Sequence, residues 1–391
     1  MKLSVVIVSY NVRYYLAQCI DSVMRATRDM EADIWVVDNN SSDDSVTYLS
    51  ERFPQVNFIS NHENVGFARA NNQAIKLSHG EYVLLLNPDT IVGEDVLKSC
   101  VAFLDEHPEA GATGTMMINR NGSFAYESRR GVPTPTTAFY KICGLCKLFP
   151  YNRRFGKYYM RYLDKQATSE IDIISGAFFM VRRTALEQVG LLSEDYFMYG
   201  EDIDLSYSLL LKGWKNFYQP LPILHYKGES TQKSSFRYVH SFYNAMIIFF
   251  NRHFRKRYFM LSLVVRFAVI MIGVLEMLKQ QWKTFFHKNT DDPNAELHAI
   301  FIGTYPAWKT VGDVAKRANI ILERAKDIEQ AIELARARTY NYIIFHVGDS
   351  GMAYSDVLRQ LQTLPENGFD IHLGTFNFEN PILILSDAIS L

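Results

Sequence analysis

The stretch LLLNPDT, residues 84–90, ends a strongly apolar run abruptly at turn-forming residues. An apolar run bounded in this way predicts a buried strand, and Pro88 keeps Asn87 extended while it removes a backbone donor. Asp89 is therefore expected at the carboxyl end of a strand, which is where open α/β sheets bind their ligands.

Strand and helix patterns alternate on both sides of this stretch. Strand patterns before it are LSVVIVSY, ADIWVVDNNS and residues 56–60, and helix patterns cover residues 14–25 and the segment after Gly66. Such alternation predicts a parallel sheet flanked by helices. The pattern returns at IDIISGAFFMVRR, a strand that continues into a helix. A further helix, which Gly213 would end, and the strand-like FYQPLPILHYKG follow. Between residues 111 and 168 it is lost, and we expect loops and short helices there.

Composition excludes several classes of protein. The 391 residues are 48% hydrophobic and 21% charged, which suffices for a large core and more than one domain. With 41 basic and 42 acidic residues, the formal charge of -1 gives no general attraction to nucleic acid. The four cysteines, including the pair Cys143 and Cys146, match neither a disulfide framework nor a zinc site. We expect semi-buried thiols in a cytoplasmic protein, with residues 1–11 forming a strand and not a signal peptide.

An aromatic and basic region follows residue 235. The apolar span of residues 259–275 approaches the length of a membrane-spanning helix, but Arg266 near its middle would cost about 2.5–3.5 kcal/mol at a bilayer centre. The alternatives for residues 259–278 are an interfacial helix, a spanning helix and a buried core helix. Basic flanks on both sides favour a helix lying on an anionic surface. We therefore predict amphipathic, membrane-associating helices over residues 235–290, on the inner face of the cell membrane.

The last hundred residues, 291–391, show another α/β pattern. It consists of HAIFIGTY, a long helical pattern through ILERAKDIEQAIELARARTY, the strand NYIIFHVGDS, another helix and FDIHLGTF. This alternation predicts a small three-layer α/β domain. Asp349 follows a strand and is interpreted as a polar turn residue.

The sequence lacks two common nucleotide-binding motifs. The strand ends in Ser9-Tyr10-Asn11 without a G-x-G-x-x-G sequence, and the chain has no G-x-x-x-x-G-K-S/T loop. Dinucleotide-dependent enzymes and ordinary kinases are thereby disfavoured. Carboxylates at strand ends or before a helix remain, namely Asp38, Asp89 and the pair Glu201-Asp202.

Seven motifs occur in a fixed order: VVIVSYN, VVDNNSSDDS, NVGFARANN, LLLNPDT, ISGAFFMVRR, MYGEDIDLSY and HYKGES. In this order the sequence resembles family 2 glycosyltransferases with the GT-A fold, especially the bacterial rhamnosyltransferase-like branch. The resemblance implies a catalytic domain over residues 1–234 with a mixed, mostly parallel central sheet. It does not extend over the last third of the chain.

The resemblance also implies a nucleoside-diphosphate-sugar donor. Asp38 would bind the base or ribose, although a turn or helix-cap aspartate has the same appearance. The helix after Gly66, with Arg69, would face the diphosphate, and an ordinary helix start looks similar. Gly176 would leave room for the sugar. The donor-side residues implied are Ser9, Tyr10, Asn11, Asp38, Asn64, Gly66, Arg69, Asn87 and Gly176.

Asp89 matches the second acid of the family's D-x-D motif, which binds a divalent metal between the donor phosphates. Asn87 replaces the first acid, so Asp89 would be the direct ligand of Mg²⁺ or Mn²⁺, together with His225. A strand-end histidine is otherwise more often structural. Lys227 or Lys233 would add charge near the leaving group.

Inverting transfer requires a base for the acceptor hydroxyl. By resemblance Asp202 is the candidate base and Glu201 orients the acceptor or the donor sugar, while Glu201 and Asp204 are the alternatives for the base. An aspartate at a helix start also favours the helix dipole and can be no more than a cap.

The sequence thus predicts a metal-dependent, inverting glycosyltransferase at the cytoplasmic membrane. The acceptor would be a hydroxyl of a glycan or lipid-linked saccharide in cell-surface polysaccharide synthesis, and rhamnose from a dTDP donor is the candidate suggested by the branch. One alternative is an inactive sugar-nucleotide-binding or scaffolding subunit. Another is a sugar-phosphate nucleotidylyltransferase, which would need a glycine-rich basic loop where this chain has Ser9-Tyr10-Asn11.

Overall fold

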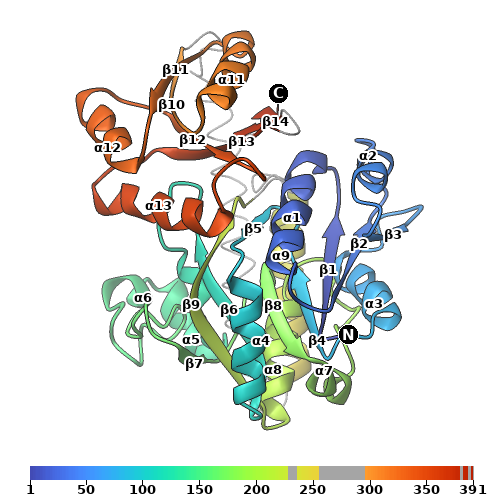
Figure 1. Cartoon of the computed structure of the whole chain (residues 1–391). Helices are drawn as coiled ribbons and strands as arrows, with labels where there is room; N and C mark the ends of the chain where they lie inside the picture. Colours follow the sequence, from blue (N-terminus) through green and yellow to red (C-terminus); the bar gives the residue numbers. More distant parts are fainter. Residues whose placement is uncertain (228–235, 255–295, 379–381, 386–388, 391) are drawn as a thin grey trace.

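The structure is a computed structural model that describes residues 1–227, 236–254, 296–378, 382–385 and 389–390. It contains a nine-stranded sheet in the N-terminal part of the chain and a six-stranded sheet in the C-terminal part (Figure 1). The predicted α/β class, with a mostly parallel large sheet and a second small α/β unit, is confirmed.

The first half of the large sheet follows the predicted alternation. Its elements are β1 (Leu3–Ser9), α1 (Arg13–Ala26), β2 (Ala32–Asp38), α2 (Ser45–Arg52), β3 (Asn57–Ser60), α3 (Phe67–Leu77) and β4 (Tyr82–Leu86). The strand order is β3-β2-β1-β4, and β1 is parallel to both β2 and β4. The chain therefore reverses its winding direction beside β1, and a crevice at the carboxyl ends of such strands is the usual ligand site of open α/β sheets.

The second half of this sheet mixes strand directions. Its elements are β5 (Thr90–Val92), α4 (Val96–Glu106), β6 (Ala110–Ile118), the 3₁₀ turn η1 (Tyr126–Ser128), α5 (Pro135–Ile142), α6 (Leu145–Leu148), β7 (Ser169–Ile171), β8 (Phe178–Arg182), α7 (Arg183–Val189), α8 (Glu201–Leu211) and β9 (Lys215–His225). Strand β8 is antiparallel to β4 and β6, while β9 is parallel to β6. The carboxyl ends of β1, β2, β4, β6 and β9 consequently meet at one edge.

Strand β6 corrects the expectation of loops from residue 111 onward. All nine of its residues are buried. A strand that is covered on both faces shows no alternation of polar and apolar residues, so periodicity could not reveal it.

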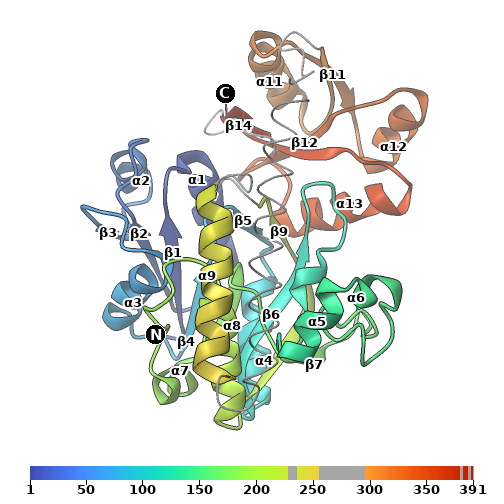
Figure 2. The same cartoon turned by 180° about the vertical axis from the view of Figure 1, so that it is seen from behind.

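Helices cover both faces of the large sheet because successive strand side chains point to opposite sides. Val5 and Ile7 of β1 pack in one core with Leu16 of α1, whereas Val6 packs in the other core with Ala74 of α3. Figure 1 shows α1 and α4 on the near face, and Figure 2 shows α8 and α9 (Phe236–His253) on the opposite one.

Four parallel strands make up most of the small sheet. Its elements are β10 (Leu297–Ile302), α11 (Tyr305–Arg317), β11 (Ile320–Ala325), α12 (Ile328–Ala337), β12 (Tyr342–Val347), α13 (Tyr354–Glu366), β13 (His372–Asn377), β14 (Ile382–Leu385) and β15 (Ile389–Ser390). The expectation of one long helical pattern through ILERAKD was wrong, because residues 320–325 form β11, parallel to β10. Glu323 and Arg324 favour helices locally, but pairing with β10 overrides that preference.

Helix α13 joins the two parts of the chain. The carboxylate of Glu94 accepts hydrogen bonds from the backbone N–H groups of Tyr354 and Ser355, each at 2.8 Å. The Tyr354 hydroxyl donates to Asp21 Oδ2 at 2.9 Å. An added Cβ at Gly122 would lie 2.1 Å from the carbonyl oxygen of Leu361, so only glycine permits this close approach. The six-stranded unit is thus docked on the large sheet by specific, partly buried contacts.

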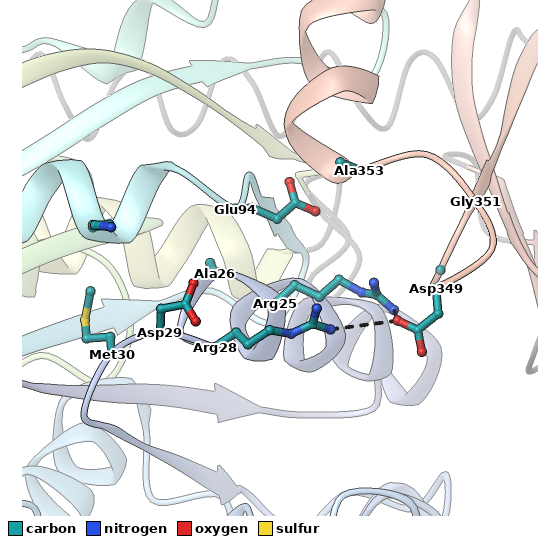
Figure 3. A pocket seen from close by; sticks show the side chains of 11 residues that line it. Arg25, Ala26, Arg28, Asp29, Met30, Glu94, Asp349, Gly351 and Ala353 are labelled. Atoms are coloured by element: carbon teal, nitrogen blue, oxygen red, sulfur yellow. Dashed lines mark ion pairs between the residues drawn. The ribbon is translucent and has the colours of Figure 1, made fainter.

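A hollow of about 400 Å³ lies at this junction, between the end of α1 and the loop after β12 (Figure 3). Arg25 forms a salt bridge with Asp349 across it, with Nη2 and Oδ1 3.0 Å apart. Asp349, which we interpreted as a polar turn residue, therefore also forms an ion pair between the two parts of the chain. No predicted donor, metal or catalytic residue lines this hollow.

Helix α9 is the described part of the predicted membrane-associating region. Phe249, Phe250 and Phe254 are buried beside Ile203 of α8, so this end of the region belongs to the protein core. The predicted helix over residues 259–278 lies outside the described residues. Among the helices that the structure describes, none combines the length and apolar character needed to cross a membrane.

Candidate active site

The carboxyl edge of the large sheet brings Asn87, Asp89 and His225 together. Strand β4 ends at Leu86, and β5 resumes at Thr90, which lies opposite His225 of β9. His225 Nε2 lies 3.3 Å from Asp89 Oδ1 and 3.2 Å from Asn87 Nδ2. Residues separated by more than a hundred positions in sequence thus converge on one point, because β5 and β9 are antiparallel neighbours.

The electrostatics of this cluster favour an ionised Asp89. Burial alone would raise the pKa of the Asp89 carboxyl, but the charge and hydrogen bond of His225 outweigh it, and backbone N–H groups add to the effect. The pKa of Asp89 is therefore lowered. His225 Nδ1 is buried and has no hydrogen-bond partner within the described part of the chain.

These side chains suit a hard divalent cation. A carboxylate and an imidazole supply oxygen and nitrogen ligands, and cations of the Mg²⁺ class are often held by one or two protein groups together with substrate phosphates. Over the described ranges, no three or more His, Cys, Asp or Glu side chains gather at one point suited to a metal ion. A metal at Asp89 and His225 would accordingly need the donor phosphates to complete its coordination.

Asp38 and Ser9 end the neighbouring strands β2 and β1. Asp38 Oδ2 accepts a hydrogen bond from the Ser41 backbone N–H at 2.9 Å. Its Oδ1 and the Ser9 hydroxyl are buried without hydrogen-bond partners among the residues described. Buried polar atoms ordinarily have partners, so these two are available to a ligand at the crevice beside β1.

The turn after β1 is tied to the turn after β2. Asn11 N–H donates to Ser41 Oγ at 2.9 Å, and Asn11 Oδ1 accepts from the Ser42 N–H at 2.7 Å. Tyr10 is exposed between these contacts. Asn11 therefore shapes the turn through its side chain, and Tyr10 is free to face a ligand from solvent.

Asn64, Gly66 and Arg69 do not present an open phosphate site. Asn64 Oδ1 accepts the Gly66 N–H at 3.1 Å, and the first helical N–H of α3, at Phe67, donates to the Phe197 carbonyl at 2.8 Å. An added Cβ at Gly66 would lie 2.7 Å from that same carbonyl oxygen. Arg69 pairs with Glu194, with Nε and Oε2 3.2 Å apart. Gly66 thus serves close packing against the loop that precedes α8.

Gly176 packs directly against the side chain of Asp202 and does not border an open cavity. An added Cβ at Gly176 would lie 3.2 Å from the Asp202 Cβ, and the Gly176 N–H donates to Asp202 Oδ2 at 3.0 Å. The adjacent Ala177 carbonyl accepts the Asn87 N–H at 3.1 Å. The turn before β8 therefore connects the cluster of Asn87 with the helix start of Asp202.

The two acidic residues at the start of α8 have different surroundings. Asp202 Oδ2 also accepts from Arg130 Nη2 at 2.5 Å, and its Oδ1 accepts the Ile203 N–H at 2.8 Å. Glu201 Oε2 is buried and has no hydrogen-bond partner in the described structure. Burial, and then the charge of Asp202, raise the pKa of Glu201 to about 8. A carboxyl with such a pKa can exchange a proton near neutral pH.

Asp204 is occupied by contacts with α9. Its Oδ1 accepts from the Tyr196 hydroxyl at 3.3 Å and lies 2.6 Å from His253 Nε2. Arg252 Nε lies 3.7 Å from the same oxygen. The buried Asp204 therefore fastens α9 to α8, which disfavours it as the alternative base.

One partner of the site was not found by sequence reasoning. Arg130, in the segment without a clear pattern, holds Asp202. Lys227 contacts Glu127 and Asn119, so its charge is already shared. Lys233 lies outside the described residues. The sequence does show two adjacent arginines at positions 129 and 130, but it does not indicate that one of them pairs with a residue 72 positions away.

A hollow of about 480 Å³ lies at the carboxyl end of β6. Asn119, Tyr126 and Glu127 line it from the large sheet, and Gln362 and Glu366 line it from α13. Asn119 and Glu127 are the two residues that contact Lys227, two positions after His225. The hollow is therefore a neighbour of the Asp89 and His225 cluster.

The fold and this edge define the chain as an α/β protein whose buried polar side chains gather at the carboxyl edge of its large sheet, where open α/β sheets usually bind their ligands. Comparison with known proteins then gives the family that the chain resembles. Residues 4–190 match the family described as Glycosyl transferase family 2.

Two relatives illustrate the range of similar proteins. The N-acetylglucosaminyl-diphospho-decaprenol L-rhamnosyltransferase of Mycobacterium tuberculosis is 29% identical over 265 residues, which span 64% of this chain and 85% of that protein. The poly-beta-1,6-N-acetyl-D-glucosamine synthase of Staphylococcus aureus is 27% identical over 190 residues, 48% of this chain and 40% of that protein. Among solved structures, the mannosyltransferase PcManGT from Pyrobaculum calidifontis, in complex with GDP-Man and Mn²⁺, aligns with a TM-score of 0.44 and 16% identity over 81% of this chain and 80% of that one.

The CxxC pair corrects one further expectation. Cys143 is exposed and Cys146 is buried, so the two thiols are not equally semi-buried. All four cysteines are free.

Proposed function

We propose that this chain is an inverting glycosyltransferase that transfers a sugar from a nucleoside diphosphate to a hydroxyl of a glycan or lipid-linked saccharide in cell-surface polysaccharide synthesis. The observation that carries the proposal is the pair of the buried Asp89 and the partly buried His225, joined through the turn before β8 to Asp202. The match to glycosyltransferase family 2 supports the reaction class.

The donor would lie in the crevice beside β1. The unpartnered Asp38 Oδ1 and Ser9 hydroxyl would bind the base or ribose. Asp89 and His225 would hold Mg²⁺ or Mn²⁺, with Asn87 beside them. A bound divalent cation would neutralise the negative charge that develops on the leaving diphosphate. Because Arg69 and the start of α3 are engaged by the loop before α8, they would contact the diphosphate only if that loop moved.

The acceptor hydroxyl must lose a proton as its oxygen attacks the anomeric carbon. Asp202 remains the candidate base, held in place by Arg130 and Gly176. Glu201 is the alternative, because its pKa of about 8 and its unpartnered Oε2 suit proton exchange near neutral pH. The hollow lined by Tyr126 and Glu127 is the candidate place for the acceptor.

The candidate sugar and the membrane location follow from one of the relatives. Rhamnose is the candidate sugar because one relative, matched over 85% of its own length, is an L-rhamnosyltransferase whose name specifies a diphospho-decaprenol acceptor. A lipid-linked acceptor would require the chain to work at the inner membrane face. The scaffolding alternative predicts nucleotide binding without turnover.

A release assay tests the proposal. The purified chain is incubated with Mn²⁺, a lipid-linked saccharide and one of dTDP-rhamnose, UDP-sugars or GDP-mannose, and free nucleoside diphosphate and glycosylated product are both measured. Transfer is expected with one donor and is expected to stop on chelation. Nucleotide binding with no transfer from any donor would favour the scaffolding alternative.

A further inference from the structure

The segment of residues 128–163 has an unusual charge. It contains eight arginine or lysine residues and eight aromatic residues, but no aspartate or glutamate. The whole chain carries a net charge of -1, so this segment concentrates positive charge locally. Arg130 and Lys157 pair with Asp202 and Asp172, which lie outside the segment.

Large apolar side chains are exposed on the same segment. Leu148 is 70% exposed and Tyr151 is 69% exposed. Phe139, Ile142 and Phe149 are also exposed. Single exposed apolar residues are common, but five within thirteen positions are not scattered.

Ring contacts join two of these residues, Phe139 and Phe149, through Tyr140 and Phe155. The rings of Phe139 and Tyr140 are 6.2 Å apart, those of Tyr140 and Phe155 are 5.0 Å apart, and those of Phe155 and Phe149 are 5.7 Å apart. The contacts connect α5 with the segment after α6, which protrude together from the side of the large sheet in both views (Figures 1 and 2). We call this surface the α5–α6 patch. Its apolar members are Phe139, Ile142, Leu148, Phe149 and Tyr151.

The patch is surrounded by cations that are available to a partner. Lys147, Arg153 and Arg154 are exposed, and Lys141 lies over the Tyr158 ring with Nζ 3.7 Å from its centre. Within the described residues none of these four forms a salt bridge with an acidic side chain. A matching surface must therefore be apolar and negatively charged.

We propose that the α5–α6 patch inserts into the interfacial region of an anionic lipid bilayer. Aromatic and aliphatic side chains enter the boundary between headgroups and acyl chains, while lysine and arginine side chains contact anionic headgroups. A second copy of the chain fits poorly, because self-association through this face would bring the same four cations together. The inference stands on this surface alone and does not require the chain to be a transferase.

Insertion here would orient the candidate active site toward the lipid. Arg130, near the start of the same segment, forms the ion pair with Asp202. Val132, two residues further on, packs with Ile203 of α8. The patch thus belongs to the same segment whose first residues contact the start of α8 at Asp202.

Cys143 offers a direct probe of the patch in the full chain. It is exposed between the apolar residues, whereas the other three cysteines are buried. An environment-sensitive fluorophore attached through a maleimide to Cys143 reports the polarity at this point. The matched control carries Cys143→Ser and Leu211→Cys, because Leu211 is 62% exposed at the end of α8.

We expect a blue shift of emission at Cys143 on addition of phosphatidylcholine vesicles that contain about one third phosphatidylglycerol, and quenching by lipid-borne quenchers. Pure phosphatidylcholine vesicles should give a much smaller shift, and the Leu211 probe none. Leu148→Asp with Tyr151→Asp should weaken vesicle binding at the Cys143 probe by about tenfold or more, since both side chains are exposed and would otherwise enter the bilayer.

Three results would overturn the proposal. One is vesicle binding by the chain with unchanged emission at Cys143, which would assign the membrane contact to another part of the chain. The second is an equal response to charged and uncharged vesicles. The third is a shift that depends on protein concentration without lipid, which would identify a second copy as the occupant.

Discussion

Arg130 and Asp202 form an ion pair in which Nη2 lies 2.5 Å from Oδ2. Both side chains are largely buried. Burial alone would lower the pKa of Arg130, but the adjacent carboxylate outweighs it and raises the pKa. The pair fixes the start of α8, which carries both candidate catalytic acids.

Replacing Arg130 should therefore destabilise the fold. Arg130→Met leaves the carboxylate of Asp202 in a buried position without its cation, and such losses cost about 3–5 kcal/mol of unfolding free energy. Urea unfolding followed by tryptophan fluorescence measures the loss. Arg153→Met, an exposed residue, is the matched control and should change stability by less than about 0.5 kcal/mol. Equal effects of the two variants would show that the pair adds nothing specific.

Glu201 should make stability fall as pH rises. Its pKa in the folded chain is about 8, above its ordinary 4.5. The folded chain therefore holds a proton that the unfolded chain releases, so this group's contribution is full below pH 4.5 and is lost as pH rises through 8. Glu201→Gln cannot ionise, so its stability relative to the wild type should increase from about pH 5 to about pH 8.5.

Unfolding free energies of both proteins at several pH values test this expectation. Glu63→Gln, at an exposed position, serves as the control for loss of one charge. A difference between Glu201→Gln and the wild type that stays constant with pH would contradict a raised pKa.

Turnover separates the two candidate bases. Removal of a general base should lower kcat by about 10² to 10⁴. We expect that loss for Asp202→Asn, with donor affinity retained, and a smaller loss for Glu201→Gln. The opposite order would transfer the role of base to Glu201. Asp204→Asn is the third variant to compare. It should lower the stability of the fold and not kcat, because Asp204 binds α9.

The contact of Glu94 with α13 should stabilise the junction of the two parts. Burial alone would raise the pKa of Glu94, but the N–H groups of Ser355 and Tyr354 outweigh it and lower the pKa. Its contribution is thus present above pH 4.5 and lost as pH falls through the lowered folded-state pKa. Glu94→Ala should cost about 0.5–2 kcal/mol at neutral pH, measured by urea unfolding. Glu106→Ala, an exposed residue of α4, should cost little, and a Glu94 variant with no greater effect would refute the capping role.

The alternating strands and helices made the first half of the large sheet predictable. Strand β1 and helix α1 were placed within one or two residues because their apolar patterns are strong and uninterrupted. Strand β6 was missed because it is buried on both faces, and β11 was taken for helix because its residues Glu323 and Arg324 favour helices. Local sequence carries no information about the strand that will pair with it.

The site was predictable only as far as its residues follow strand ends. Asp38 and Asp89 could be placed at the carboxyl edge from the pattern alone. The role of Gly66 could not be predicted in this way. Glycine is required there because the Phe197 carbonyl, in a loop distant in sequence, lies too close for a side chain. Arg130 was missed for the same reason, since its partner lies in another motif.

The most direct test of the account is calorimetric titration of dTDP, UDP and GDP into the chain with Mn²⁺ or with chelator. Wild type is compared with Asp89→Asn and with Asp313→Asn, an exposed control on α11. We expect that one nucleotide binds with metal, that chelation weakens this binding, and that Asp89→Asn removes the metal dependence while Asp313→Asn keeps it. Binding of the same nucleotide that is equally tight without metal and in Asp89→Asn would contradict the proposed donor and metal site.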